Sequence, residues 1–144
     1  IAGASGGMLA GWMSDHLFGS RRAPVAGILY SALLLAVIGM IFALDGDAHL
    51  LGILVFIVSI AVIGTHGMLS GTATMDFGGR KAAATAVGLI DGLVYLGTGI
   101  QSLSLGYITS SNWHYWPVFL IPFAVAGILL TLRIWHAIPT RKTR

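Results

Sequence analysis

The stretch PVAGILYSALLLAVIGMIFAL, residues 24–44, decides the fold class because it contains no charged residue and almost no polar side chain. A helix that crosses the hydrocarbon core of a bilayer needs about 20 consecutive apolar residues. The stretch is long enough to cross once, and Pro24 near its start is compatible with the first turn of a helix. The sequence therefore predicts a membrane-spanning α-helix over residues 24–44.

Apolar segments of similar length continue on the carboxyl side of this span. They cover residues 50–75, 82–110 and 116–135. The apolar segment 1–14 reaches only about 21 Å as a helix, too short to cross a bilayer. We therefore expect residues 1–14 to be the end of a helix that begins upstream, and residues 1–144 to be a fragment of one larger transmembrane domain. The predicted fold class is all-α, a polytopic membrane helix bundle.

The composition supports membrane insertion and excludes several function classes. Hydrophobic residues make up 56% of the chain and charged residues 9%, whereas soluble domains carry about 25% charged residues. The net charge of +3 does not indicate nucleic-acid binding, because the basic residues lie in short clusters between spans. Cysteine is absent, and no metal-ligand spacing, nucleophile–base pair or glycine-rich phosphate loop is present. We predict no enzyme activity, no cofactor and no metal site.

The segments between the spans alternate in charge and so predict an orientation. The clusters in order are Arg21 and Arg22; Asp45 and Asp47; Arg80 and Lys81; the uncharged Asn112–His114; and Arg141, Lys142 and Arg144. Because loops rich in Lys and Arg stay in the cytoplasm, the first and third loops and the C-terminus are expected there. The predicted location is a multi-pass protein of the cell (inner) membrane.

The predicted spans differ in polarity. Segments 24–44 and 116–135 carry no ionisable residue in mid-span, whereas 50–75 and 82–110 carry His66, Asp91 and Gln101. Polar transmembrane helices face protein or a water-filled cavity, while apolar ones can face lipid. We therefore expect 50–75 and 82–110 to line a pathway and the other two spans to support them. Glycines spaced four apart at 3, 7 and 11, at 67 and 71, and at 88 and 92 predict close helix packing.

Asp91 is the most informative residue because a carboxylate at the middle of a membrane helix costs about 2.5–3.5 kcal/mol. Asp91, Tyr95, Thr98 and Ser102 share one helical face. His66 is expected at a similar depth on the antiparallel neighbour, where an imidazole suits phosphate contact, proton coupling or helix packing. We predict that Asp91, Tyr95, Thr98 and His66 bind the transported solute. A purely structural aspartate, bonded to backbone or to a basic residue elsewhere, is the alternative.

The stretch GWMSDHLFGSRR, residues 11–22, resembles the cytoplasmic loop signature of the major facilitator superfamily. Its matching residues are Gly11, Asp15, Gly19, Arg21 and Arg22. His16 replaces a usual basic residue, and the segment between Asp15 and Gly19 is one residue longer than the commonest form. The resemblance implies that this loop contacts neighbouring helices and takes part in gating.

The stretch GGRKAAATAVGLIDGLVYLGTG, residues 78–99, resembles the loop and penultimate helix of the organophosphate:phosphate antiporters, which include glycerol-phosphate and sugar-phosphate permeases. The matching positions are Arg80–Ala83 and Tyr95–Gly97. The resemblance implies that the chain corresponds to helices 8 (partial) to 12 of a major facilitator fold, with helices 10 and 11 lining the central pathway. Asp91 departs from the family, because the glycerol-phosphate type has a small residue there.

The resemblance implies secondary active transport of a phosphorylated organic anion, exchanged for inorganic phosphate by alternating access. The implied partners are this substrate, phosphate, the lipid bilayer and the N-terminal half of the same protein. Two alternatives remain open at this point. Asp91 would suit a proton-coupled facilitator for another small metabolite, and transporter-like hexose-phosphate sensors share the same helices.

Overall fold

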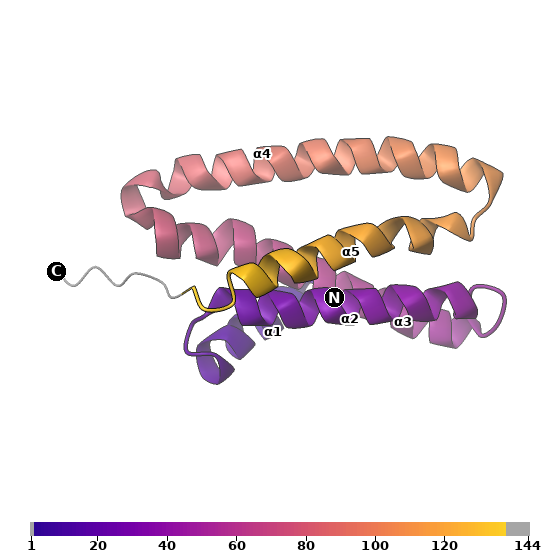
Figure 1. Ribbon diagram of the computed structural model, residues 1–144, viewed down its shortest axis with the longest axis horizontal. Helices are drawn as coiled ribbons and strands as arrows, with labels where there is room; N and C mark the ends of the chain where they lie inside the picture. The colour runs from indigo at the N-terminus through magenta and orange to yellow at the C-terminus, as the bar shows by residue number, and fades with distance from the viewer. Residues whose placement is uncertain (1, 138–144) are drawn as a thin grey trace.

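The computed structural model describes residues 2–137, apart from the side chains of residues 72 and 75–81. The described chain folds into helices and short turns. In order, the helices are α1 (Ala2–Leu17), α2 (Arg22–Ala43), α3 (Ala48–His66), the π-helix η1 (Gly67–Thr72), α4 (Ala73–Ser111) and α5 (Tyr115–Arg133). The elongated bundle is shown in Figure 1, where α4 runs along the top and α2 and α3 lie below α5.

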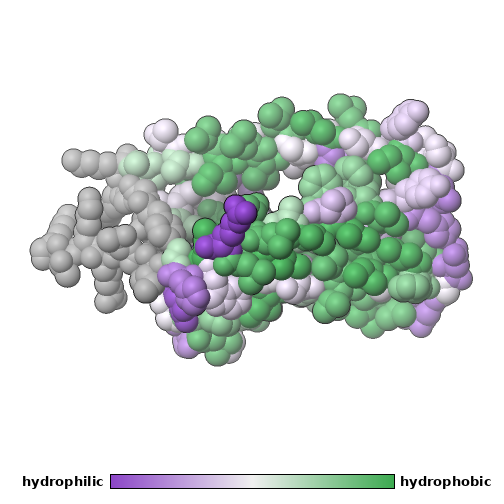
Figure 2. All heavy atoms as spheres, viewed as in Figure 1, coloured by the Kyte–Doolittle hydropathy of each residue, from purple (hydrophilic) through white to green (hydrophobic). Residues whose placement is uncertain are grey.

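The predicted all-α membrane fold is confirmed. Four described segments are long and apolar enough to cross a bilayer, at Arg22–Ala43, Ala48–Gly71, Ala82–Ser111 and Tyr115–Arg133. They correspond to the spans expected at 24–44, 50–75, 82–110 and 116–135, with ends that differ by a few residues. The first helix, α1, extends to Leu17 rather than ending at residue 14. Figure 2 shows apolar side chains along the length of the bundle and polar ones at its right-hand end.

The sequence predicts a loop between spans 50–75 and 82–110. The prediction of a non-helical loop there is wrong, because α4 is helical from Ala73 onward. This segment contains no proline, but its two consecutive glycines disfavour a helix, so intrinsic propensity does not explain the helical conformation. The chain nevertheless reverses direction. His66 Nε2 lies 4.0 Å from Asp91 Oδ1, whereas a straight helix would separate these residues by about 37 Å. Figure 1 shows this return at the left end of the view.

The most buried helix is α2, which packs between α3 and α5. Val25, Ala26, Val37 and Met40 on α2 are fully buried. Within the spans, 44% of α2 is buried, compared with 6% of α4. The expectation that 24–44 is a peripheral support is therefore wrong for the described bundle. An apolar helix is compatible with lipid and equally with the centre of a helix bundle, so its composition does not distinguish the two.

Close helix packing depends on different glycines from those in the predicted ladders. At the crossing of α1 and α3, a Cβ added to Gly6 would lie 2.6 Å from the Ile60 carbonyl oxygen, and one added to Gly64 would lie 2.8 Å from the Gly6 carbonyl oxygen. Of the ladder glycines, only Gly3 has a neighbour within 4 Å of such a Cβ, at an ordinary 3.4 Å. The predicted ladders are therefore wrong in register, because which face of a helix meets another depends on the crossing geometry.

Candidate functional site

The candidate site is the contact between the end of α3 and the middle of α4. His66 is the last residue of α3, and its Nε2 lies 4.0 Å from Oδ1 of Asp91. Both side chains are about one-third exposed, at 36% and 32%. The Oδ1 atom of Asp91 is itself buried and has no hydrogen-bond partner among the described residues. The structure thus brings together two of the four predicted solute-binding residues.

The π-helix η1 begins directly after His66. At its end, the Ala73 N–H donates to the Met68 carbonyl, a bond that spans five residues instead of the usual four. The buried Thr74 hydroxyl lies within hydrogen-bonding distance of the Ser70 and Gly71 carbonyl oxygens, at 2.8 and 2.7 Å. Short π-helices are rare and are frequently found at functional sites. Here the π-helix interrupts regular α-helical geometry next to the histidine that faces Asp91.

Tyr95 and Thr98 follow Asp91 along α4, one and two turns further on. Tyr95 is 71% exposed. Thr98 is also exposed, and its hydroxyl donates to the Val94 carbonyl of the same helix at 2.9 Å. The described residues therefore leave both side chains available, and their role in binding stays a prediction.

The His66–Asp91 contact is an ion pair when the imidazole is protonated. A carboxylate accepts hydrogen bonds, and an imidazolium donates two. At 4.0 Å the two atoms are too far apart for a hydrogen bond, and a small side-chain movement would form one. Among the described residues, no group of three His, Cys, Asp or Glu side chains could hold a metal ion. The arrangement can therefore exchange partners, with the imidazolium facing either Asp91 or another anion.

The second site is the turn between α1 and α2, which contains the predicted loop motif. Arg22 Nη1 donates to Asp15 Oδ1 at 3.0 Å and to Ser14 Oγ at 2.9 Å. The fully buried Ser14 hydroxyl in turn donates to the Arg21 carbonyl at 3.2 Å. Ser20 Oγ also donates to Asp15 Oδ1, at 3.0 Å. Asp15 and Arg22 thus connect the end of α1 with the start of α2.

The other motif residues lie at or near the same turn. Gly19 and Ser20 both have positive φ, at +57° and +63°, and the Ser20 N–H donates to the Ser14 carbonyl at 2.8 Å. Two consecutive left-handed residues accommodate the long segment between Asp15 and Gly19. Arg21 Nε donates to the Phe18 carbonyl at 3.2 Å, whereas a Cβ on Gly11 would meet no atom within 4 Å.

We expect Ser14→Ala to lower the stability of the folded protein by about 1 kcal/mol, because it removes a buried hydroxyl that bonds to both Arg21 and Arg22. Thermal unfolding in detergent measures the effect. Ser5→Ala on the same helix is the matched control, because the exposed Ser5 hydroxyl bonds only to the Ala2 carbonyl. Equal melting temperatures for the two variants would contradict a structural role for the Ser14 hydroxyl.

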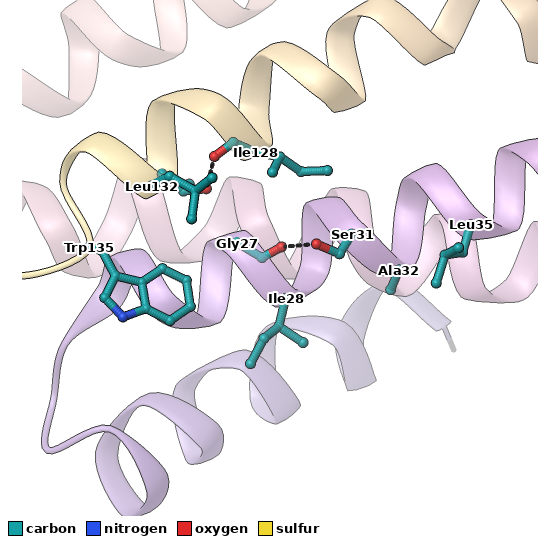
Figure 3. A pocket seen from close by; sticks show the side chains of 9 residues that line it. Gly27, Ile28, Ser31, Ala32, Leu35, Ile128, Leu132 and Trp135 are labelled. Atoms are coloured by element: carbon teal, nitrogen blue, oxygen red, sulfur yellow. Dashed lines mark hydrogen bonds between the residues drawn. The ribbon is translucent and has the colours of Figure 1, made fainter.

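An apolar groove among the described residues lies elsewhere. It has a volume of about 440 Å³ between α2 and α5, and Figure 3 shows Trp135 beside Gly27 and Ile28 at one end and Leu35 at the other. The hydroxyls of Ser31 and Thr131 bond to carbonyls of their own helices. A groove with a mostly apolar lining and no charged side chain among its lining residues does not fit a phosphorylated solute, so we do not place the solute site there.

One polar contact was missed at the sequence level. His114 Nε2 lies 2.8 Å from Asp45 Oδ1, although the two residues are 69 positions apart. They belong to different turns at the end of the bundle opposite to the Asp15–Arg22 motif. The sequence carries a signal for each residue, a histidine and an acid next to helix ends, but nothing in it indicates which turns meet.

These features define a class of protein: a polytopic all-α membrane protein with a His–Asp contact between two of its membrane-spanning segments. The chain is 30% identical over 139 residues to a probable hexose phosphate transport protein of Chlamydia trachomatis, covering 95% of this chain and 30% of that protein. It is 31% identical to a glycerol-3-phosphate transporter of Bacillus subtilis, covering 94% and 31%. It is 27% identical to the membrane sensor protein UhpC of Salmonella typhimurium, covering 99% and 32%.

The similarities confirm the resemblance to the organophosphate:phosphate antiporters of the major facilitator superfamily, over almost the whole of this chain. The chain spans about a third of the length of these curated relatives. No family model matches the chain. No solved structure matches it.

Proposed function

We propose that the full-length protein carries a phosphorylated organic anion, of the glycerol-phosphate or sugar-phosphate type, across the membrane in exchange for inorganic phosphate. The observation that carries the proposal is the similarity of 95% of the chain to probable hexose phosphate transport proteins. Similarity to a glycerol-3-phosphate transporter of Bacillus subtilis and to a putative one of Arabidopsis thaliana supports the same substrate class. The chain then contributes helices 8 (partial) to 12 and works with an N-terminal half.

In this proposal His66 and Asp91 form a switch at the solute site. A phosphate group is an anion that competes with Asp91 for the same imidazolium. With the site empty, His66 faces Asp91; with phosphate bound, His66 turns to phosphate. Binding then weakens a contact between α3 and α4 and biases the equilibrium between inward-open and outward-open states. Tyr95 and Thr98 extend the polar face, and their hydroxyls are suited to bond phosphate or sugar oxygens.

The Asp15–Arg22 turn has the gating role in this proposal. Its hydrogen bonds join α1 to α2, so that the two helices move together at that end of the bundle. Gly11, Gly19 and Arg21 belong to the same motif. By the distribution of basic residues, this turn and the C-terminus face the cytoplasm, and the Asp45–His114 end faces outward.

We expect the full-length protein, reconstituted in vesicles loaded with inorganic phosphate, to take up labelled glycerol 3-phosphate or glucose 6-phosphate faster than vesicles loaded with sulfate. An exchanger gives this result because the outward transport of internal phosphate returns the binding site to its outward-open state, where it can bind the next labelled substrate. The measurement is the initial uptake rate with each internal anion, and vesicles without protein are the control.

Other outcomes of this assay support the two alternative functions. Uptake that depends on a proton gradient and not on internal phosphate would contradict exchange and support a proton-coupled facilitator. The acidic side chain of Asp91 is compatible with this function. Binding of hexose phosphate without any flux would support a sensor, which the similarity to UhpC favours.

A further inference from the structure

The contact between Asp45 and His114 joins two turns that are far apart in the sequence. Asp45 lies in the turn between α2 and α3, and His114 lies in the turn between α4 and α5. Only 6% of the α4 span is buried, and its described contacts are with η1, with α5 and, through Asp91, with His66. Because α5 packs along α2, the Asp45–His114 contact adds to an existing association of these helices and bears on the position of the end of α4.

Both ring nitrogens of His114 face oxygen acceptors. Nε2 lies 2.8 Å from Asp45 Oδ1, and Nδ1 lies 2.9 Å from Asn112 Oδ1. The amide of Asn112 is held in this orientation, because the same Oδ1 also accepts the backbone N–H of His114 at 2.9 Å. Turning the amide round would place its NH₂ group against that N–H. Neutral imidazole has one N–H and one lone pair, so it satisfies only one of the two contacts.

We propose that Asp45, Asn112 and His114 form a proton-dependent clamp that closes when His114 is doubly protonated. The imidazolium donates one hydrogen bond to Asp45 and one to Asn112. Loss of one proton leaves a lone pair facing an oxygen atom, so one of the two hydrogen bonds is lost and the clamp is weakened. The geometry therefore determines the direction of the pH effect. Low pH strengthens the contact between the end of α4 and the α2–α3 turn, and high pH weakens it.

The other titratable groups near these turns do not compete for the imidazole. They are Asp47, His49, Tyr107 and Tyr115. Asp47 uses its Oδ1 to accept the His49 N–H at 2.8 Å and so caps α3. Tyr107 and Tyr115 are exposed, at 81% and 52%. Asp45 is thus the charged partner of His114 among the described residues. This proposal does not depend on the transported solute.

The clamp is tested by spin labels on cysteines introduced at Gly46 and Ser111, since the chain contains no cysteine of its own. Any native cysteine in the rest of the full-length protein is first replaced. Dipolar broadening in continuous-wave spectra of the reconstituted protein measures how close the two turns lie. As the pH is lowered from about 8 to about 5, the closed population is expected to rise. The rise in the closed-to-open ratio should be about two- to fivefold, the contribution of an exposed ion pair.

Two variants and one control separate the clamp from other pH effects. His114→Gln and Asp45→Asn are each expected to abolish the pH dependence of the broadening. His49→Gln should retain the pH dependence. The exposed His49 is four residues from Asp45 in the sequence, and its ring makes no hydrogen bond to Asp45 among the described residues. Broadening that is independent of pH in the unaltered labelled protein, or that still follows pH in His114→Gln, would overturn the proposal.

Discussion

Replacing Gly6 with alanine is expected to destabilise the folded protein by about 1–3 kcal/mol, the usual cost of adding a methyl group to a filled interface. The new Cβ would lie 2.6 Å from the Ile60 carbonyl oxygen and 3.1 Å from the Ile60 Cα. Both are backbone atoms, so no side chain can rotate away, and α1 would have to move from α3. Thermal unfolding of the solubilised protein gives the loss of stability.

The adjacent glycine supplies a matched control. A Cβ on Gly7 meets no atom within 4 Å, so Gly7→Ala should be neutral or stabilising by up to about 1 kcal/mol, because alanine favours the helix over glycine. Both substitutions make the same chemical change in the same helix. A Gly7→Ala variant that loses as much stability as Gly6→Ala would show that α1 presents a different face to α3.

Replacing Asp91 with asparagine is expected to lower the exchange rate of the reconstituted protein about 10- to 100-fold, if Asp91 and His66 form the proposed switch. A hydrogen bond to a charged group, formed when the side chains close from 4.0 Å to bonding distance, contributes about 1.5–3 kcal/mol, and each 1.4 kcal/mol changes a rate about tenfold. Asparagine keeps the size of the side chain and removes the charge that competes with phosphate. The initial rate of phosphate-driven uptake measures the effect.

Coupling between the two residues distinguishes a switch from two separate roles. His66→Gln should lower exchange by a similar factor, and the double variant should fall little below either single one, since residues that act as a unit are not additive. Gln101→Ala is the control on α4, because Gln101 lies about 80° around the helix from Asp91. Additive losses for Asp91 and His66 would reject the switch and leave a packing role for His66.

The membrane fold could be predicted from the sequence because the signal is local. A run such as residues 24–44 must satisfy its backbone within the helix when it enters lipid, and its length alone matches the bilayer. The polar face of Asp91, Tyr95 and Thr98 follows from helical periodicity in the same way. The loop signature at 11–22 and the run at 78–99 carried the family resemblance, which the relatives confirm.

Tertiary structure decided which of these local features meet. Only the fold-back of the chain brings His66 to 4.0 Å from Asp91, and only the arrangement of the turns brings His114 to Asp45. Gly6 and Gly64, which are close-packed against backbone atoms, do not belong to the predicted ladders. Helical periodicity states which residues share a face. Which face lies against a neighbour depends on crossing angles and turns, and these are set by contacts between residues far apart in the sequence.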